Sequence, residues 1–146
     1  RDSVASRGLG DVYKRQVCNT RIGSRAPAHA TSAGKIMMAY QSEDFVEAFC
    51  RDLSQMQPLT AWTITSPAQL REALVRARAD GYAMDKEEIE PGLICVGAPV
   101  FGMGQQVLAA VSIAGPAFRM QKELESMIQE VKQTAANISR LLGGRV

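Results

Sequence analysis

The chain has 146 residues, which is enough for one domain of ordinary size. Hydrophobic residues make up 46% and charged residues 22% of the chain, so a packed core is expected and intrinsic disorder is excluded. The longest nearly uncharged stretch, residues 92–118, is interrupted by prolines and glycines. The sequence therefore predicts no membrane-spanning helix and no membrane partner, and it shows no signal peptide at its start.

Cysteine and histidine usage argues against a metal centre. The three cysteines, Cys18, Cys50 and Cys95, form no C-x-x-C pair, and an odd number does not suggest a disulfide framework. His29 is the only histidine. We therefore expect no metal site and no cofactor, and a reducing, cytoplasmic location.

Residues 1–16 are predicted to be non-native. The segment 11–16, DVYKRQ, reads codon by codon as GATGTGTATAAGAGACAG, a sequence that resembles a transposon end used in preparing sequencing libraries. A natural flexible arm is the alternative. Residues 1–16 carry the whole net charge of +2, so residues 17–146 have 13 basic and 13 acidic residues. The rest of the chain therefore offers no basic stripe for nucleic-acid phosphates.

Helical periodicity appears in four places after a strand remnant and loop at 17–29. Apolar spacing predicts a helix from Ala30, a second one capped by Ser42, a third from Ser66–Pro67 to Gly81, and a long one from about Arg119 to Leu142. The apolar stripe of the last helix is expected to be core, with a subunit contact as the alternative.

Strand-like runs lie between these helices. We predict short strands at 60–65 and 82–85, an acidic solvated turn at 86–90, and a hairpin of 92–101 with 106–115. Helices interleaved with hairpin-paired strands indicate an α+β fold in which helices cover an antiparallel sheet. So few strands for this many helices suggest that N-terminal strands of the sheet are missing.

Five segments of the chain are similar to a known protein family: residues 25–35, 59–65, 78–85, 87–100 and 110–116. In order and spacing they resemble the C-terminal effector-binding domain of IclR-family bacterial transcription regulators, over roughly residues 20–144. The resemblance implies a GAF-like (profilin-like) fold that binds a small carboxylate or aromatic acid. It also implies a separate N-terminal winged helix-turn-helix domain that contacts DNA, and a homodimer or tetramer. Residues 17–146 are accordingly expected to be a partial domain of this type.

The family's effector pocket carries over onto six positions. These are the backbone around Ser32 and Ala33, Asp85, Cys95, and two serine positions of the last strand, here Ser112 and Ala114. The alanine at 114 departs from the family pattern and removes one hydroxyl from the pocket.

The bare sequence supports part of this pocket. A helix N-terminus at Ser32 offers free N–H groups to a carboxylate, although a capped core helix explains the same residues. We predict an even hairpin loop, which would pair Cys95 with Ser112, and Leu93 with Ala114, on one face. The alternative, a three-residue loop, would pair Cys95 with Val111 and send Ser112 to the other face. Cys95 is otherwise a small buried residue, and Asp85 is equally well explained as a cap of the next turn. His29 is expected to be structural and to bond the backbone near the helix entry.

The leading hypothesis is a ligand-sensing module of a DNA-binding regulator, with no catalytic residue. One rival is a thiol enzyme that uses Cys95, with His29 as base and Asp85 to orient it. Another is a stand-alone sensor that never carried a DNA-binding domain. No nucleotide-binding or hydrolase motif is present to support other catalytic classes.

Overall fold

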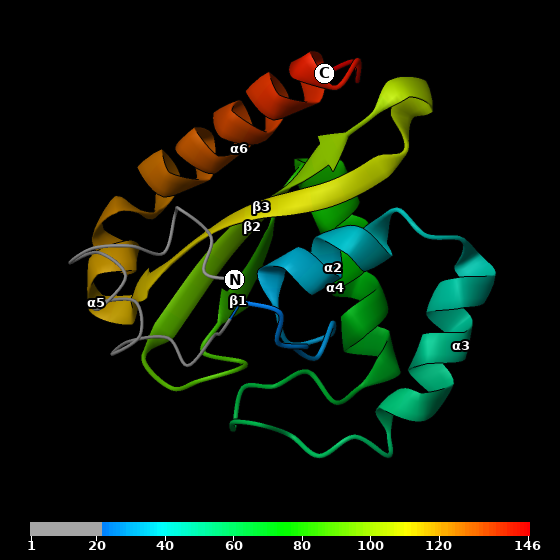
Figure 1. Ribbon diagram of the computed structural model, residues 1–146. Coiled ribbons are helices and arrows are strands. Elements are labelled where there is room, and N and C mark those ends of the chain that lie inside the picture. The colour runs from blue at the N-terminus through cyan, green and yellow to red at the C-terminus, as the bar shows by residue number, and fades with distance from the viewer. Residues whose placement is uncertain (1–21) are drawn as a thin grey trace.

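A three-stranded antiparallel sheet is the centre of the molecule. The computed structural model describes residues 22–146, so residues 1–16 and the start of the strand remnant lie outside the described residues. Strands β1 (Ala83–Lys86), β2 (Leu93–Phe101) and β3 (Val107–Pro116) pair in the order β1-β2-β3. The long pair β2 and β3 crosses the molecule diagonally (Figure 1).

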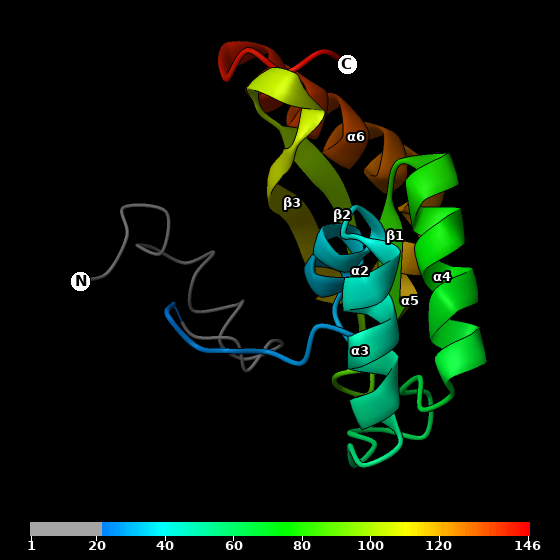
Figure 2. The ribbon, with the colours of Figure 1, turned by 90° about the vertical axis from the view of Figure 1, so that its right-hand side faces the viewer.

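Helices α2 (Ser32–Ala39), α3 (Glu43–Leu53) and α4 (Pro67–Asp80) form one side of the molecule (Figure 2). Their ends lie where the capping residues predict. Ser42 accepts a hydrogen bond from the backbone N–H of Phe45, Pro67 occupies the first turn of α4, and Gly81 ends it with a positive φ of 75°. The predicted helices over these segments are confirmed.

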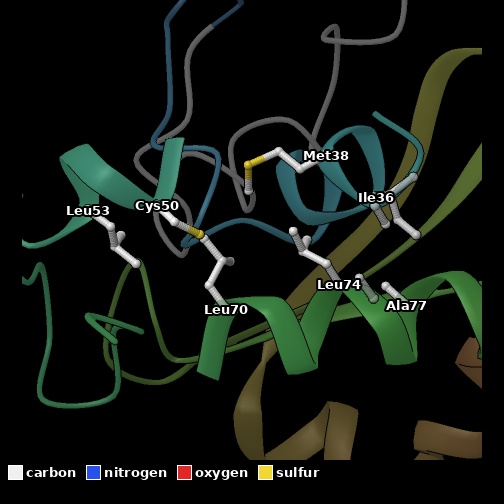
Figure 3. Packing of buried hydrophobic residues seen from close by; sticks show 9 residues of the cluster. Ile36, Met38, Cys50, Leu53, Leu70, Leu74 and Ala77 are labelled. Atoms are coloured by element: carbon white, nitrogen blue, oxygen red, sulfur yellow. The ribbon is translucent and has the colours of Figure 1, made fainter. Parts of the chain in front are cut away.

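The core on this side is apolar and continuous. Cys50 and Leu53 of α3 meet α4, which turns its buried face toward Ile36 and Met38 of α2 (Figure 3). The buried positions of α4 are Leu70, Leu74 and Ala77, spaced at 4 and 3 residues along one face. This cluster fixes α2 above the sheet.

The C-terminal helices cover the other face of the sheet. The predicted single helix is three pieces: α5 (Ala117–Met120), a 3₁₀ turn at Gln121–Glu123, and α6 (Leu124–Leu141). The inward stripe of α6, with Val131 and Ala135 at its centre, packs on the even-numbered residues of β2. The core role predicted for this stripe is confirmed.

The predicted strand at 60–65 is wrong, because threonine hydroxyls satisfy the backbone locally. Thr63 Oγ1 accepts from the N–H groups of Leu59 and Thr60, at 3.0 and 2.9 Å. It also donates to the carbonyl of Glu88 at 2.6 Å. Residues 54–66 are therefore a folded connection between α3 and α4, and Trp62 within it is exposed.

The predicted hairpin register is wrong by two residues. Cys95 pairs with Ala114, and Gly97 pairs with Ser112. The loop between the paired residues Phe101 and Val107 comprises residues 102–106, an odd number, so the predicted even loop is wrong, and a further register shift follows between Val100 and Phe101. Beyond that shift the total displacement of two keeps each side chain on its predicted face, so Cys95, Ser112 and Ala114 still share one face.

The predicted α+β fold, with helices covering an antiparallel sheet, is confirmed by this arrangement. The two faces differ in what covers them. Helix α2 lies over one face, and α6 lies over the other (Figures 1 and 2). The site residues expected from the sequence lie on the face of α2.

Candidate functional site

The strand residues of the candidate site form two neighbouring rows across the sheet. Asp85, Cys95 and Ala114 lie opposite one another on β1, β2 and β3. The next row on the same face contains Gly97 and Ser112. The three strands thus bring four of the six predicted site residues together.

The first turn of α2 supplies the remaining two residues, Ser32 and Ala33. Thr31 caps the helix, and its Oγ1 accepts from the N–H of Gly34 at 3.1 Å. The N–H groups of Ser32 and Ala33 are therefore the ones left outside the helix's own hydrogen bonding. The interpretation as a capped helix and the interpretation as an anion-binding terminus are both compatible with this geometry.

Gly97 lets the helix approach the sheet at this point. A Cβ atom at Gly97 would lie 3.1 Å from Ser32 Oγ and 3.3 Å from its carbonyl carbon. Real Cβ contacts are rarely this short, so a larger residue would push the α2 terminus away from β2. Gly97 is a site residue that the sequence reasoning missed, and its place among apolar strand residues was the available signal.

Asp85 is the most deeply buried polar residue of the strand rows, at 1% exposure. Its Oδ1 accepts from the N–H of Glu88 at 2.7 Å, which confirms the predicted capping role. Its Oδ2 is buried and has no hydrogen-bond partner. Burial raises the pKa of Asp85 from 3.8 to about 6 and the charge of the Glu88 carboxylate acts in the same direction, whereas the N–H groups of Glu88 and Ile89 and the Lys35 ammonium oppose this shift.

A buried ion pair lies directly beside Asp85. Lys35 Nζ contacts both carboxylate oxygens of Glu88, at 2.6 and 2.5 Å, and also donates to the carbonyl of Met84 at 2.8 Å. Lys35 and Glu88 are exposed by only 3% and 5%. The pair therefore ties α2 to the turn that follows β1.

Glu88 contradicts the prediction that residues 86–90 form a solvated acidic turn. Its carboxylate binds Lys35, its N–H holds Asp85, and its carbonyl accepts from Thr63. The positive φ of 61° at Glu87 turns the chain so that Glu88 faces inward. Composition alone could not separate this buried carboxylate from those of Glu87 and Glu90, which are half-buried.

His29 is buried at the entry to α2, as its structural assignment predicts. Burial lowers the pKa of its imidazole, with the Glu88 carboxylate acting in the opposite direction and Lys35 in the same direction. Its Nδ1 has no hydrogen-bond partner, so the predicted bond to the backbone is not made by that atom. The ring lies 6.2 Å from the ring of Phe49.

The site is open on the side of β3. Ser112 and Ala114 are exposed, whereas Ser32 and Asp85 are buried. A separate groove of about 590 Å³, lined by Tyr82 and residues of the 3₁₀ turn and α6, lies on the other face. It contains none of the six predicted residues.

Among residues 22–146, no three His, Cys, Asp or Glu side chains are grouped so that they could hold a metal ion. None of the helices described in this part of the chain is long and apolar enough to cross a bilayer.

A helix N-terminus that lies against polar residues of an antiparallel sheet is an arrangement that can bind an anionic group. The family model of the bacterial transcriptional regulator IclR C-terminal domain matches residues 11–140, and the chain belongs to this family. That match overlaps the last six residues of the segment predicted to be non-native, which stays a prediction.

Similar proteins agree with this assignment. HTH-type transcriptional regulator BhcR of Paracoccus denitrificans is 36% identical over 118 residues, which cover 80% of this chain and 42% of that protein. The crystal structure of transcriptional regulator YaiJ is 35% identical, with a TM-score of 0.79 over 85% of this chain and 70% of that one.

A third similar protein has a ligand in its structure. The inducer-binding domain of an Acinetobacter PobR double mutant, in complex with 3-hydroxybenzoic acid, is 27% identical, with a TM-score of 0.75 over 83% of this chain and 70% of that one. The chain spans about half the length of the full-length regulators it matches.

Family membership also decides between the sensor and the thiol enzyme. The relatives are transcriptional regulators, so the prediction that the chain is not an enzyme is confirmed. The geometry agrees, because Asp85 Oδ2 and His29 Nδ1 are both without a hydrogen-bond partner, so these two atoms do not bond to each other. A catalytic triad would instead need this carboxylate to orient an imidazole.

Proposed function

We propose that this chain is the ligand-sensing part of a cytoplasmic, homo-oligomeric DNA-binding regulator, and that it binds a small carboxylate or aromatic acid between α2 and the sheet. The observation that carries the proposal is the convergence of six residues from four elements on one face. The known complex of the PobR inducer-binding domain with 3-hydroxybenzoic acid supports the ligand class.

Each part of the site has a role in this proposal. The N–H groups of Ser32 and Ala33 bind the carboxylate, because a helix N-terminus carries partial positive charge. Asp85 and Ser112 contact polar groups of the effector, and Cys95 and Ala114 form an apolar floor between them. DNA is contacted only by a separate N-terminal domain of the regulator.

Ala114 narrows the effector class. A serine at this position would offer one more hydroxyl beside Cys95. Sites that hydrogen-bond a polar group reject ligands lacking it, so the alanine relaxes that rejection. We therefore propose an effector with fewer polar groups, or with one more apolar substituent, than the ligands suited to a two-serine pocket.

Calorimetric titration of the chain with 3-hydroxybenzoate, benzoate and acetate tests the site. We expect stoichiometric binding of at least one acid, weakened about 2- to 10-fold by Ser112→Ala through loss of one hydrogen bond. Ser126→Ala is the matched control, because Ser126 is exposed on α6. Equal effects of the two variants would place the site elsewhere, and no binding of any acid would contradict the ligand class.

Sequencing the native gene upstream of the codon for Val17 tests the rest of the proposal. We expect an in-frame helix-turn-helix, a linker helix and further strands, with no counterpart of residues 1–16. A start codon close to Val17 would instead define a stand-alone sensor, and a native sequence encoding residues 1–16 would refute the adaptor hypothesis.

A further inference from the structure

The buried charges around Asp85 do not balance. Lys35 is the buried cation of the cluster, and its ammonium group is held by both oxygens of the Glu88 carboxylate. Asp85 is even more buried than either partner, and its Oδ2 has no hydrogen-bond partner. An ionised Asp85 is therefore a second buried negative charge, and the charge of the neighbouring cation, Lys35, is already neutralised by Glu88.

Within residues 22–146, Lys35 and Glu88 are the charged groups that act on Asp85. From α2 it faces Lys35, and from its own turn it faces Glu88, whereas Glu87 Oε1 turns away to accept from the N–H of Gly92. The row partners on β2 and β3 are Cys95 and Ala114. His29, before α2, has a lowered pKa that favours the neutral imidazole.

We propose that Glu88 acts as a positioning residue that keeps Lys35 from Asp85, so that Asp85 binds a proton when a carboxylate effector enters the site. This inference rests on the proposed function, because it concerns the same site. It makes effector affinity depend on pH. The carboxylate of an effector bound at the N-terminus of α2 would meet a like charge at low dielectric if Asp85 were ionised, and protonated Asp85 can donate a hydrogen bond from Oδ2 to a polar group of the effector.

The sign of the pH dependence follows from this geometry. An effector that binds only the protonated form of Asp85 loses affinity as that form is depleted. Above the Asp85 pKa, affinity for an anionic acid should fall about tenfold for each unit of pH. A neutral amide of the same shape should show no such slope, because it does not repel the carboxylate.

Nuclear magnetic resonance of the unliganded chain tests the role of Glu88 without any effector. The carboxyl carbon of Asp85 is followed from pH 3 to 9, with an expected midpoint near 6, as its raised pKa indicates. Glu88→Gln removes a negative charge that raises the Asp85 pKa and releases Lys35 to pair with Asp85, so the midpoint should fall by about 1 unit or more.

Glu47→Gln is the matched control for this titration. It removes a carboxylate that is also ion-paired, with Arg71 at 2.7 Å, but on the exposed face of α3. The Asp85 midpoint should not move in this variant. A midpoint near the ordinary value in the wild-type chain, or an unchanged midpoint in Glu88→Gln, would overturn the proposal.

Calorimetry with 3-hydroxybenzoate tests proton uptake in the wild-type chain, even where Glu88→Gln does not fold. Titration at pH 7 in phosphate and in Tris counts the protons taken up, and close to one per bound acid is expected. The neutral 3-hydroxybenzamide serves as the comparison. Binding of the acid without proton uptake would refute this inference alone, whereas no binding of any tested acid would refute the proposed function and leave the titration of Asp85 to decide the role of Glu88.

Discussion

Even-numbered residues of β2 pack under α6, and odd-numbered residues of the same strand face α2. The first set, from Ile94 to Val100, joins a purely apolar cluster. The second set includes Cys95 and Gly97 and lies beside buried Lys35, Asp85 and Glu88.

Under the proposed function, stability and ligand recognition are assigned to opposite faces of one strand. Apolar burial under α6 stabilises the fold through surface removed from water. The buried charges under α2 must be desolvated, and replacing such groups with apolar residues is often neutral or stabilising. The α2 face therefore retains a costly arrangement, which is expected where a site must bind a polar ligand.

The largest effect should follow from removing the cation of the α2 face. Lys35→Met leaves Asp85 and Glu88 as two buried acids, and we expect a loss of about 3–5 kcal/mol in the free energy of unfolding. Urea unfolding at pH 7 measures it. The double variant Lys35→Met with Glu88→Leu should recover part of this loss, and a cost of the single variant under about 1 kcal/mol would contradict the assignment of a buried pair.

The apolar face should respond differently to truncation. Ile94→Ala should cost about 2–5 kcal/mol through the cavity it creates under α6. Because Ile94 points away from the site, the affinity for 3-hydroxybenzoate should be unchanged in conditions where the variant is folded. Calorimetry on the folded variant checks this, and a large loss of affinity would show that the two faces are coupled.

Asp85→Asn should raise the free energy of unfolding above pH 6, in contrast to the two variants above. The folded-state pKa of Asp85, about 6, is above its ordinary value of 3.8, so ionisation destabilises the native state increasingly between about pH 4 and 6. Above pH 6 the variant should exceed the wild type by about 1–3 kcal/mol, and the difference should vanish near pH 4. Urea unfolding across pH 4–8 measures it, and a difference that does not vary with pH would contradict the raised pKa.

Much of the fold could be predicted because its signals are local. Ser42, Pro67 and Gly81 set helix ends through their own backbone and side-chain chemistry. The alternation along β2 and β3 placed residues on the correct faces despite a register wrong by two. The strand predicted at 60–65 failed because Thr63 bonds to its neighbours and to Glu88, 25 residues away.

The sequence could propose members of the site, but it could not give the electrostatics around them. A resemblance could point to Ser32, Asp85 and Cys95. It could not show that Glu88 points inward, because that depends on a positive φ at Glu87 and on the position of Lys35 on a different element. Long-range ion pairs leave no periodic signal in a single sequence.

The smallest expected effect concerns the open edge of the α2 face. Ala114→Ser adds a hydroxyl beside Cys95 at an exposed position, so the free energy of unfolding should change by less than about 0.5 kcal/mol. The affinity ratio of 3-hydroxybenzoate to benzoate should nevertheless rise about 2- to 10-fold, because the new hydroxyl can pair with the additional polar group. Ala109→Ser is the matched control, since Ala109 is exposed on β3 and pairs with Val100 on the α6 face, where no effector is expected. An unchanged ratio in Ala114→Ser, or the same rise in Ala109→Ser, would mean that the ligand does not reach the β3 end of the row that begins at Asp85.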